Sequence, residues 1–101
     1  MNNEIKKIVK NVLKEQVEYW YNFELVKYEV IIGDKLLGVK YKLLIEGHLY
    51  TLSDSIDLIG VTKDTIKDYI ISNLGSKINK HLFTVALSCD FWYNKRGLYY
   101  E

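Results

Sequence analysis

Apolar and polar residues follow a helical period at the start of the chain. Over residues 4–21 the apolar positions recur every three or four residues, and lysines and glutamates stand mainly between them. Nothing in the stretch breaks a helix. The pattern predicts an amphipathic helix over residues 4–21. Its apolar stripe comprises Ile5, Ile8, Val9, Val12, Leu13 and Val17.

The period changes to two over residues 24–52, which indicates β-strands. Tight turns at Asp34-Lys35 and Glu46-Gly47 predict a three-stranded antiparallel meander. In the register that these turns impose, the paired residues match in character, and the one poor pair is Lys27 opposite Lys42. The matched pairs are Tyr28 with Tyr41, Val30 with Val39, Glu29 with Lys40, Leu43 with Tyr50 and Tyr41 with Leu52.

The second half of the chain predicts helices and then a return to strand. Residues 53–82 have a helical pattern with a break near Gly60, and residues 83–100 alternate as a strand or hairpin would. We therefore expect one α+β domain over residues 1–101. Its elements would be an N-terminal helix, the meander, a helix-turn-helix-like pair and a C-terminal strand or hairpin.

Residues 51–74 carry the most specific functional pattern. Gly60 stands where a chain leaving a first helix needs a left-handed backbone, and Thr62 can cap a second helix. The segment resembles the helix-turn-helix of many bacterial and phage DNA-binding proteins, in which the second helix enters the major groove. A plain pair of helices that only packs against the sheet remains the alternative. By the resemblance, the residues that contact bases and phosphates are Thr62, Lys63, Lys67, Lys77 and Lys80.

Dense aromatic patches provide a second functional clue. Large aromatic side chains dominate protein-interface hot spots, and neighbouring aromatics on one helix or strand cannot all face the core. Some aromatic surface should therefore be exposed or buried in a complex, although an aromatic-rich core is the simpler explanation for any single residue. The candidate interface residues are Tyr19, Trp20, Trp92, Tyr93, Tyr99 and Tyr100.

Composition limits the environment and the source. The chain has 101 residues and a single cysteine, which excludes an internal disulfide. Its net charge of +1 disfavours a purely electrostatic nucleic-acid binder. No signal peptide or membrane-spanning run is evident, so we expect a cytoplasmic protein. Lysine outnumbers arginine 13 to 1. That ratio indicates an AT-rich bacterial, phage or mobile-element genome.

Catalytic and cofactor motifs are not evident in the sequence. His48 and His81 lack cysteines or carboxylates at metal-ligand spacing, and no glycine loop could cradle a phosphate. We expect no enzyme, no metal, no cofactor and no small-molecule substrate. The first hypothesis is a regulatory protein that binds duplex DNA. The alternative is a phage-type inhibitor that binds a host defence protein, as anti-CRISPR proteins do, through exposed aromatics. A third possibility is a structural subunit of a homo-oligomer. A homodimer would not separate this possibility from the first hypothesis, because helix-turn-helix proteins are commonly dimers.

Overall fold

The computed structural model describes residues 2–88, 92–93 and 99–100, with side chains over residues 2–88. Within this part of the chain, no helix is long and apolar enough to cross a membrane. The elements are α1 (Asn2–Glu18), β1 (Phe23–Ile32), β2 (Leu36–Ile45), β3 (His48–Asp57), α2 (Ile66–Tyr69), the π-helical turn η1 (Ile70–Leu74), α3 (Gly75–Leu87), β4 (Trp92–Tyr93) and β5 (Tyr99–Tyr100).

The main sheet is an antiparallel meander in the order β1-β2-β3, as the sequence predicts. All the predicted pairs form in the expected register, including Lys27 opposite Lys42. Glu46 and Gly47 have φ angles of 49° and 81°, which is the left-handed backbone that a two-residue hairpin turn requires. Val26 is the extra residue of a bulge in β1, where the register shifts between Leu25 and Lys27.

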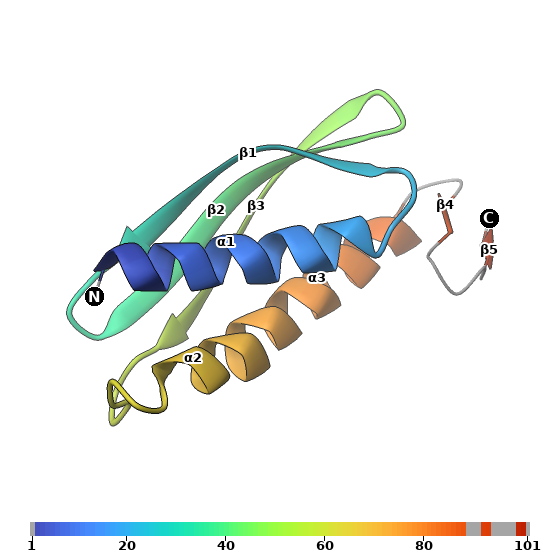
Figure 1. Cartoon of the computed structure of the whole chain (residues 1–101). Coiled ribbons are helices and arrows are strands. Elements are labelled where there is room, and N and C mark those ends of the chain that lie inside the picture. Colours follow the sequence, from blue (N-terminus) through green and yellow to red (C-terminus); the bar gives the residue numbers. More distant parts are fainter. Residues whose placement is uncertain (1, 89–91, 94–98, 101) are drawn as a thin grey trace.

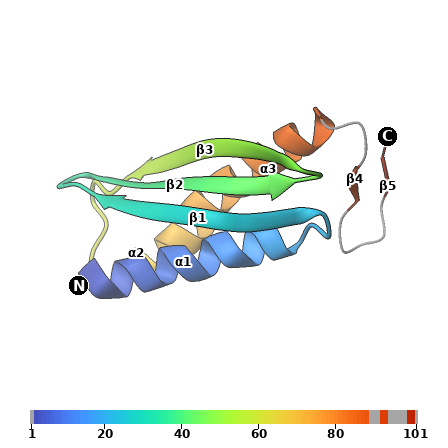
Figure 2. The ribbon, with the colours of Figure 1, turned by 90° about the horizontal axis from the view of Figure 1, so that it is seen from above.

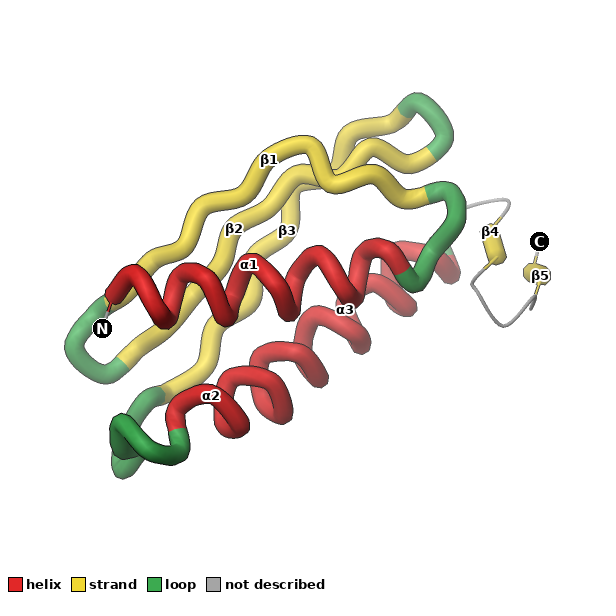
Figure 3. Tube along the Cα trace, viewed as in Figure 1, coloured by secondary structure: helices red, strands yellow, loops and turns green. Residues whose placement is uncertain are grey.

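Both long helical segments cover the same face of the sheet (Figures 1 and 2). They run side by side in the same direction, with α2, η1 and α3 forming one continuous helical stretch (Figure 3). Gly75 lies at their crossing, where a Cβ atom would stand 3.4 Å from Val12 Cγ1. The core between the layers is aliphatic at its centre, with contributions from Val9, Leu13, Leu37, Val39, Leu43, Ile45, Ile70, Leu74, Ile78 and Leu82.

The predicted first helix of the helix-turn-helix does not form. Residues 53–57 instead complete β3, which pairs with β2 up to Leu36 opposite Asp57. The reason is long-range pairing, because the backbone groups at the start of β2 that point away from β1 would otherwise lack a partner. Ile56 continues the inward alternation of the strand and is buried. Gly60 has a left-handed φ of 77° as expected, but it serves a turn between a strand and a helix.

The predicted strand over residues 83–100 also needs correction. Residues 83–87 belong to α3, because a helix that continues past Leu82 without a breaker buries Val85 and Ala86. A short apolar run fits either period, and its neighbours decide the outcome. Farther on, β4 and β5 pair antiparallel, with Trp92 opposite Tyr100. The remainder of that prediction, residues 89–91 and 94–98, lies outside the described residues.

Candidate functional site

The face of the sheet that points away from the helices is the candidate site. In Figure 2 the sheet lies over α1 and α3, and no described element covers its other side. Successive side chains of a strand point to opposite faces, so every second residue of each strand points to this outer face. On β2 the outward residues include Lys40 and Lys42, which are exposed between buried Val39, Tyr41 and Leu43.

Three lysines gather at the centre of the outer face. Lys27 of β1 stands directly opposite Lys42 of β2. Lys40 lies on the same face, two residues before Lys42 in β2. Directly opposed residues have Cβ atoms about 5 Å apart, a spacing at which like charges destabilise a sheet. Glu29 lies opposite Lys40, so one carboxylate is present among the cross-strand partners of the three lysines in the described sheet.

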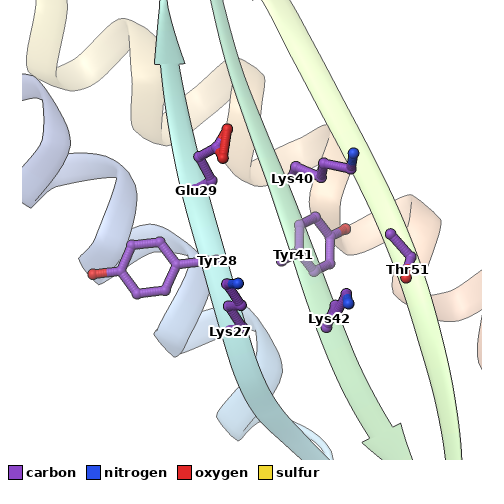
Figure 4. Close-up of a pocket in the computed structure, with 7 residues that line it drawn as sticks. All are labelled: Lys27, Tyr28, Glu29, Lys40, Tyr41, Lys42 and Thr51. Carbon is purple, nitrogen blue, oxygen red and sulfur yellow. The ribbon is translucent and has the colours of Figure 1, made fainter.

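These lysines border an open pocket that spans the three strands (Figure 4). The hydroxyl-bearing Thr51 of β3 lies opposite Lys42, so Lys27, Lys42 and Thr51 form one row across the sheet. Within residues 2–88 none of the three ammonium groups takes part in a salt bridge, because the one salt bridge there joins Asp54 and His81. The row therefore presents positive charge and a hydroxyl group to solvent.

Exposed aliphatic side chains flank the lysines at both ends of the outer face. Ile31 and Leu36 are 49% and 47% exposed at one end, and Val26 and Leu49 are 52% and 66% exposed toward the other. Gly38 lies opposite Ile31 and contributes to a hollow bordered by Ile31, Leu36, Ser53 and Ser55. The outer face thus combines a cationic centre with apolar ends.

A polar cluster lies on the opposite, helix-facing side of the sheet. Tyr41 Oη donates a 2.7 Å hydrogen bond to Asp54 Oδ2, and His81 Nδ1 lies 3.1 Å from the same oxygen. Burial raises the pKa of Tyr41 far above its usual value, and the hydrogen bond and negative charge of Asp54 raise it further. Tyr41 therefore stays protonated as a donor, and the cluster ties β2, β3 and α3 together.

The residues predicted to bind DNA are spread over the turn before α2 and the continuous helical stretch that follows it. Thr62 and Lys63 are exposed in the turn before α2, and Lys67 is exposed on the second residue of α2. The Thr62 and Thr65 hydroxyls hydrogen bond to each other at 3.1 Å, within that turn. Lys77 lies ten residues after Lys67, which is about 15 Å along a helix. Its Nζ atom donates a 2.6 Å hydrogen bond to the carbonyl oxygen of Ser55. Lys80 lines a groove between α3 and β3 that also includes Asp57, Tyr69, Ser76 and Lys77.

The predicted aromatic interface is also divided. Trp20 is only 2% exposed, stacks on Phe23 at 5.0 Å and meets the ring of Phe83 edge-on at 4.8 Å. Tyr19 is half-buried and packs edge-on against Trp20. Trp20 is therefore a core residue, contrary to the expectation of an exposed one. The side chains of Trp92, Tyr93, Tyr99 and Tyr100 lie outside the described part of the chain, so their role stays a prediction.

Comparison with known proteins returned no counterpart. No family model, no curated protein and no solved structure matches the chain. Among the described residues, no group of three or more His, Cys, Asp or Glu side chains is placed to hold a metal ion.

Proposed function

We propose that this protein is a non-enzymatic protein-binding module whose outer sheet face binds an acidic surface of a partner protein. The observation that carries the proposal is the opposition of Lys27 and Lys42 on a face that no described element covers. Within the isolated chain this pair costs stability, since both charges are positive. A partner carboxylate placed between the two ammonium groups would turn that repulsion into two favourable charge pairs.

The aliphatic ends of the face favour a protein over a nucleic acid. Single-stranded nucleic acids bind proteins through aromatic platforms, whereas the described outward residues of β1, β2 and β3 include no aromatic side chain. Ile31, Leu36 and Leu49 instead offer the apolar area that a protein interface buries around its charged contacts. The cationic centre would set the orientation of the partner, and the apolar ends would contribute most of the buried area.

Inhibition of a host defence protein is one form that this function can take. The small chain and the AT-rich residue usage suggest a phage or mobile-element origin. An inhibitor of this kind acts by occupying a surface of its target and needs no catalytic residues. The sheet face then takes the role that the sequence assigned to exposed aromatics.

Capture from a low-GC bacterial host tests the proposal with two charge-reversal pairs. Lys27→Glu with Lys42→Glu changes the outer face, and Lys63→Glu with Lys67→Glu makes the same charge change beside the helical turn. We expect the first pair to lose a protein that the wild type and the second pair both retain. A protein retained equally by both pairs would refute the proposal.

Duplex DNA is the competing partner, and a salt-titrated binding assay addresses it. Binding at low salt that is lost in the Lys63→Glu, Lys67→Glu variant but kept in the Lys27→Glu, Lys42→Glu variant would support the DNA-binding hypothesis instead. The two pairs carry equal net charge, so a difference between them reports on position alone.

A further inference from the structure

The free edge of β3 has backbone groups whose direction can be deduced from its hydrogen bonds. Leu58 N–H donates to the carbonyl oxygen of Lys35 at 2.9 Å, so even-numbered residues of β3 pair with β2. In an antiparallel ladder the alternate residues direct their N–H and C=O groups away from that partner. Leu49, Thr51, Ser53, Ser55 and Asp57 therefore direct theirs to the open edge.

Side chains of the helical segment satisfy only one end of this edge. Lys77 Nζ donates to the Ser55 carbonyl oxygen and Tyr69 Oη donates to the Asp57 carbonyl oxygen, both at 2.6 Å. Among residues 2–88, none provides a hydrogen bond to the outward backbone groups of Leu49, Thr51 and Ser53. Within the described residues, the edge is thus capped at its C-terminal end and open at the outward backbone groups of Leu49, Thr51 and Ser53.

The opposite edge of the same sheet is protected in ways that β3 is not. β1 carries Glu24, Lys27 and Glu29 together with a bulge, and both charges and bulges discourage edge-to-edge pairing. Residues 49–53 of β3 contain no charged side chain and no bulge, and leucine, tyrosine and threonine suit an extended strand. The sheet is therefore open to an added strand on one side only.

We infer that residues 49–53 of β3 accept an extended segment of the partner protein as a fourth strand, with acidic residues at alternate positions. This inference rests on the proposed function and specifies how the partner binds. An added strand pairs through its backbone, and its side chains provide the specificity. The partner is thus expected to contribute a flexible or edge segment rather than a helix.

The charge pattern of the partner segment follows from the register. Thr51 lies opposite Lys42, and Ser53 lies opposite Lys40. Both side chains are short, so the two lysines can extend across β3 toward the next strand. Acidic residues placed opposite Thr51 and Ser53 would meet Lys42 and Lys40. The residue between them would lie beside half-buried Leu52 on the helix-facing side and should be apolar.

Two synthetic heptapeptides of equal composition test this inference. One alternates Glu and Val, and the other groups the same residues in blocks so that the acidic side chains fall on both faces. In an NMR titration of the full chain, we expect the alternating peptide to bind at least tenfold more tightly. The amides of Thr51 and Ser53 should shift and become protected from hydrogen exchange.

Thr51→Pro and Thr51→Ala separate backbone pairing from side-chain contact. Proline removes an N–H that points to the open edge and leaves the ladder with β2 intact, whereas alanine keeps that N–H. We expect the proline variant to lose the alternating peptide and the alanine variant to retain it. If the proline variant does not fold, Lys40→Glu with Lys42→Glu provides the test, because it should reject the Glu/Val peptide and accept a Lys/Val peptide.

Failure of this inference differs from failure of the proposed function. Strand addition would be overturned if the two Glu/Val peptides bind equally and Thr51→Pro has no effect on their binding. The acidic-partner proposal would still stand if Lys27→Glu with Lys42→Glu abolishes that binding. Partner capture that is indifferent to Lys27 and Lys42 would overturn the proposed function itself.

Discussion

Lys27 and Lys42 lie directly opposite each other on neighbouring strands, on a sheet face that no described element covers. The next pair on the same face, two positions farther along the register, is Glu29 opposite Lys40, and its charges are matched. Two like charges directly opposite each other lower the stability of the free protein. We attribute the lysine pair to the surface that the protein presents to a partner.

Relief of this repulsion should stabilise the free protein. Lys42→Thr removes one charge and introduces a residue that suits a strand, so we expect the free energy of unfolding to rise by about 0.2–1 kcal/mol. Urea denaturation at low salt measures the change. The gain should shrink in 1 M salt, where charges are screened over about 3 Å. The matched control Lys63→Thr, outside the sheet, should change stability by less, and an equal gain would argue against a special repulsion at the pair.

Gly38 offers a way to change the outer face without disturbing the core. A Cβ atom there would lie 3.6–4.0 Å from its neighbours, which is ordinary contact distance. Gly38→Ala should raise the free energy of unfolding by about 0.4–1 kcal/mol by restricting the unfolded chain. It should also weaken partner binding by filling the hollow beside Ile31. Gly47→Ala is the contrast, because its φ of 81° makes any side chain costly and should lower stability.

Much of the sheet could be predicted because its turns are encoded locally. Asp34-Lys35 and Glu46-Gly47 set both hairpins, and a register shifted by one residue would have turned Tyr41 and Leu43 to solvent. The unusual Lys27 and Lys42 pair followed from the same register. Alternation also placed both lysines on the polar face, opposite to that of Tyr41 and Leu43. That no described element covers this face was not predictable from the sequence.

The predictions from sequence that were wrong concern segments whose local structure is decided by contacts with distant parts of the chain. Ser53 and Asp54 resemble a helix N-terminus by composition, yet pairing with β2 extends the strand through both. Trp20 falls beyond the last residue of α1, so helical periodicity could not assign its direction. Its burial depends on Phe23 and Phe83, and Phe83 lies more than sixty residues away in the chain.

The Tyr41 hydroxyl should make stability fall in alkaline solution. Its pKa is raised in the folded state above the usual value of about 10, so folding is favoured below pH 10 and the contribution is lost as the pH rises further. Tyr41→Phe should lower the free energy of unfolding by about 1 kcal/mol at pH 8. That deficit should narrow between pH 9 and pH 11 in urea titrations. Tyr28→Phe is the control, because the Tyr28 hydroxyl has no hydrogen-bond partner among residues 2–88. A constant deficit for Tyr41→Phe would contradict this pH dependence.

Trp20 should matter for folding and not as an exposed contact. Because its ring is buried between Phe23 and Phe83, Trp20→Ala should lower the free energy of unfolding by about 3–5 kcal/mol. Circular dichroism during urea denaturation measures this loss. The exposed Tyr21→Ala variant should cost much less. A folded Trp20→Ala protein of wild-type stability would show that the ring is not part of the core.

Site-specific photocrosslinking in a low-GC host tests the central claim most directly. A photoreactive residue at Ser53 lies on the outer sheet face, one at Lys14 lies on the exposed side of α1, and one at Lys63 lies beside the helical turn. The account predicts that one host protein crosslinks at Ser53 and at neither other position, and that Lys27→Glu with Lys42→Glu abolishes the product. Crosslinking of that protein at Lys14 or Lys63 but not at Ser53 would contradict it.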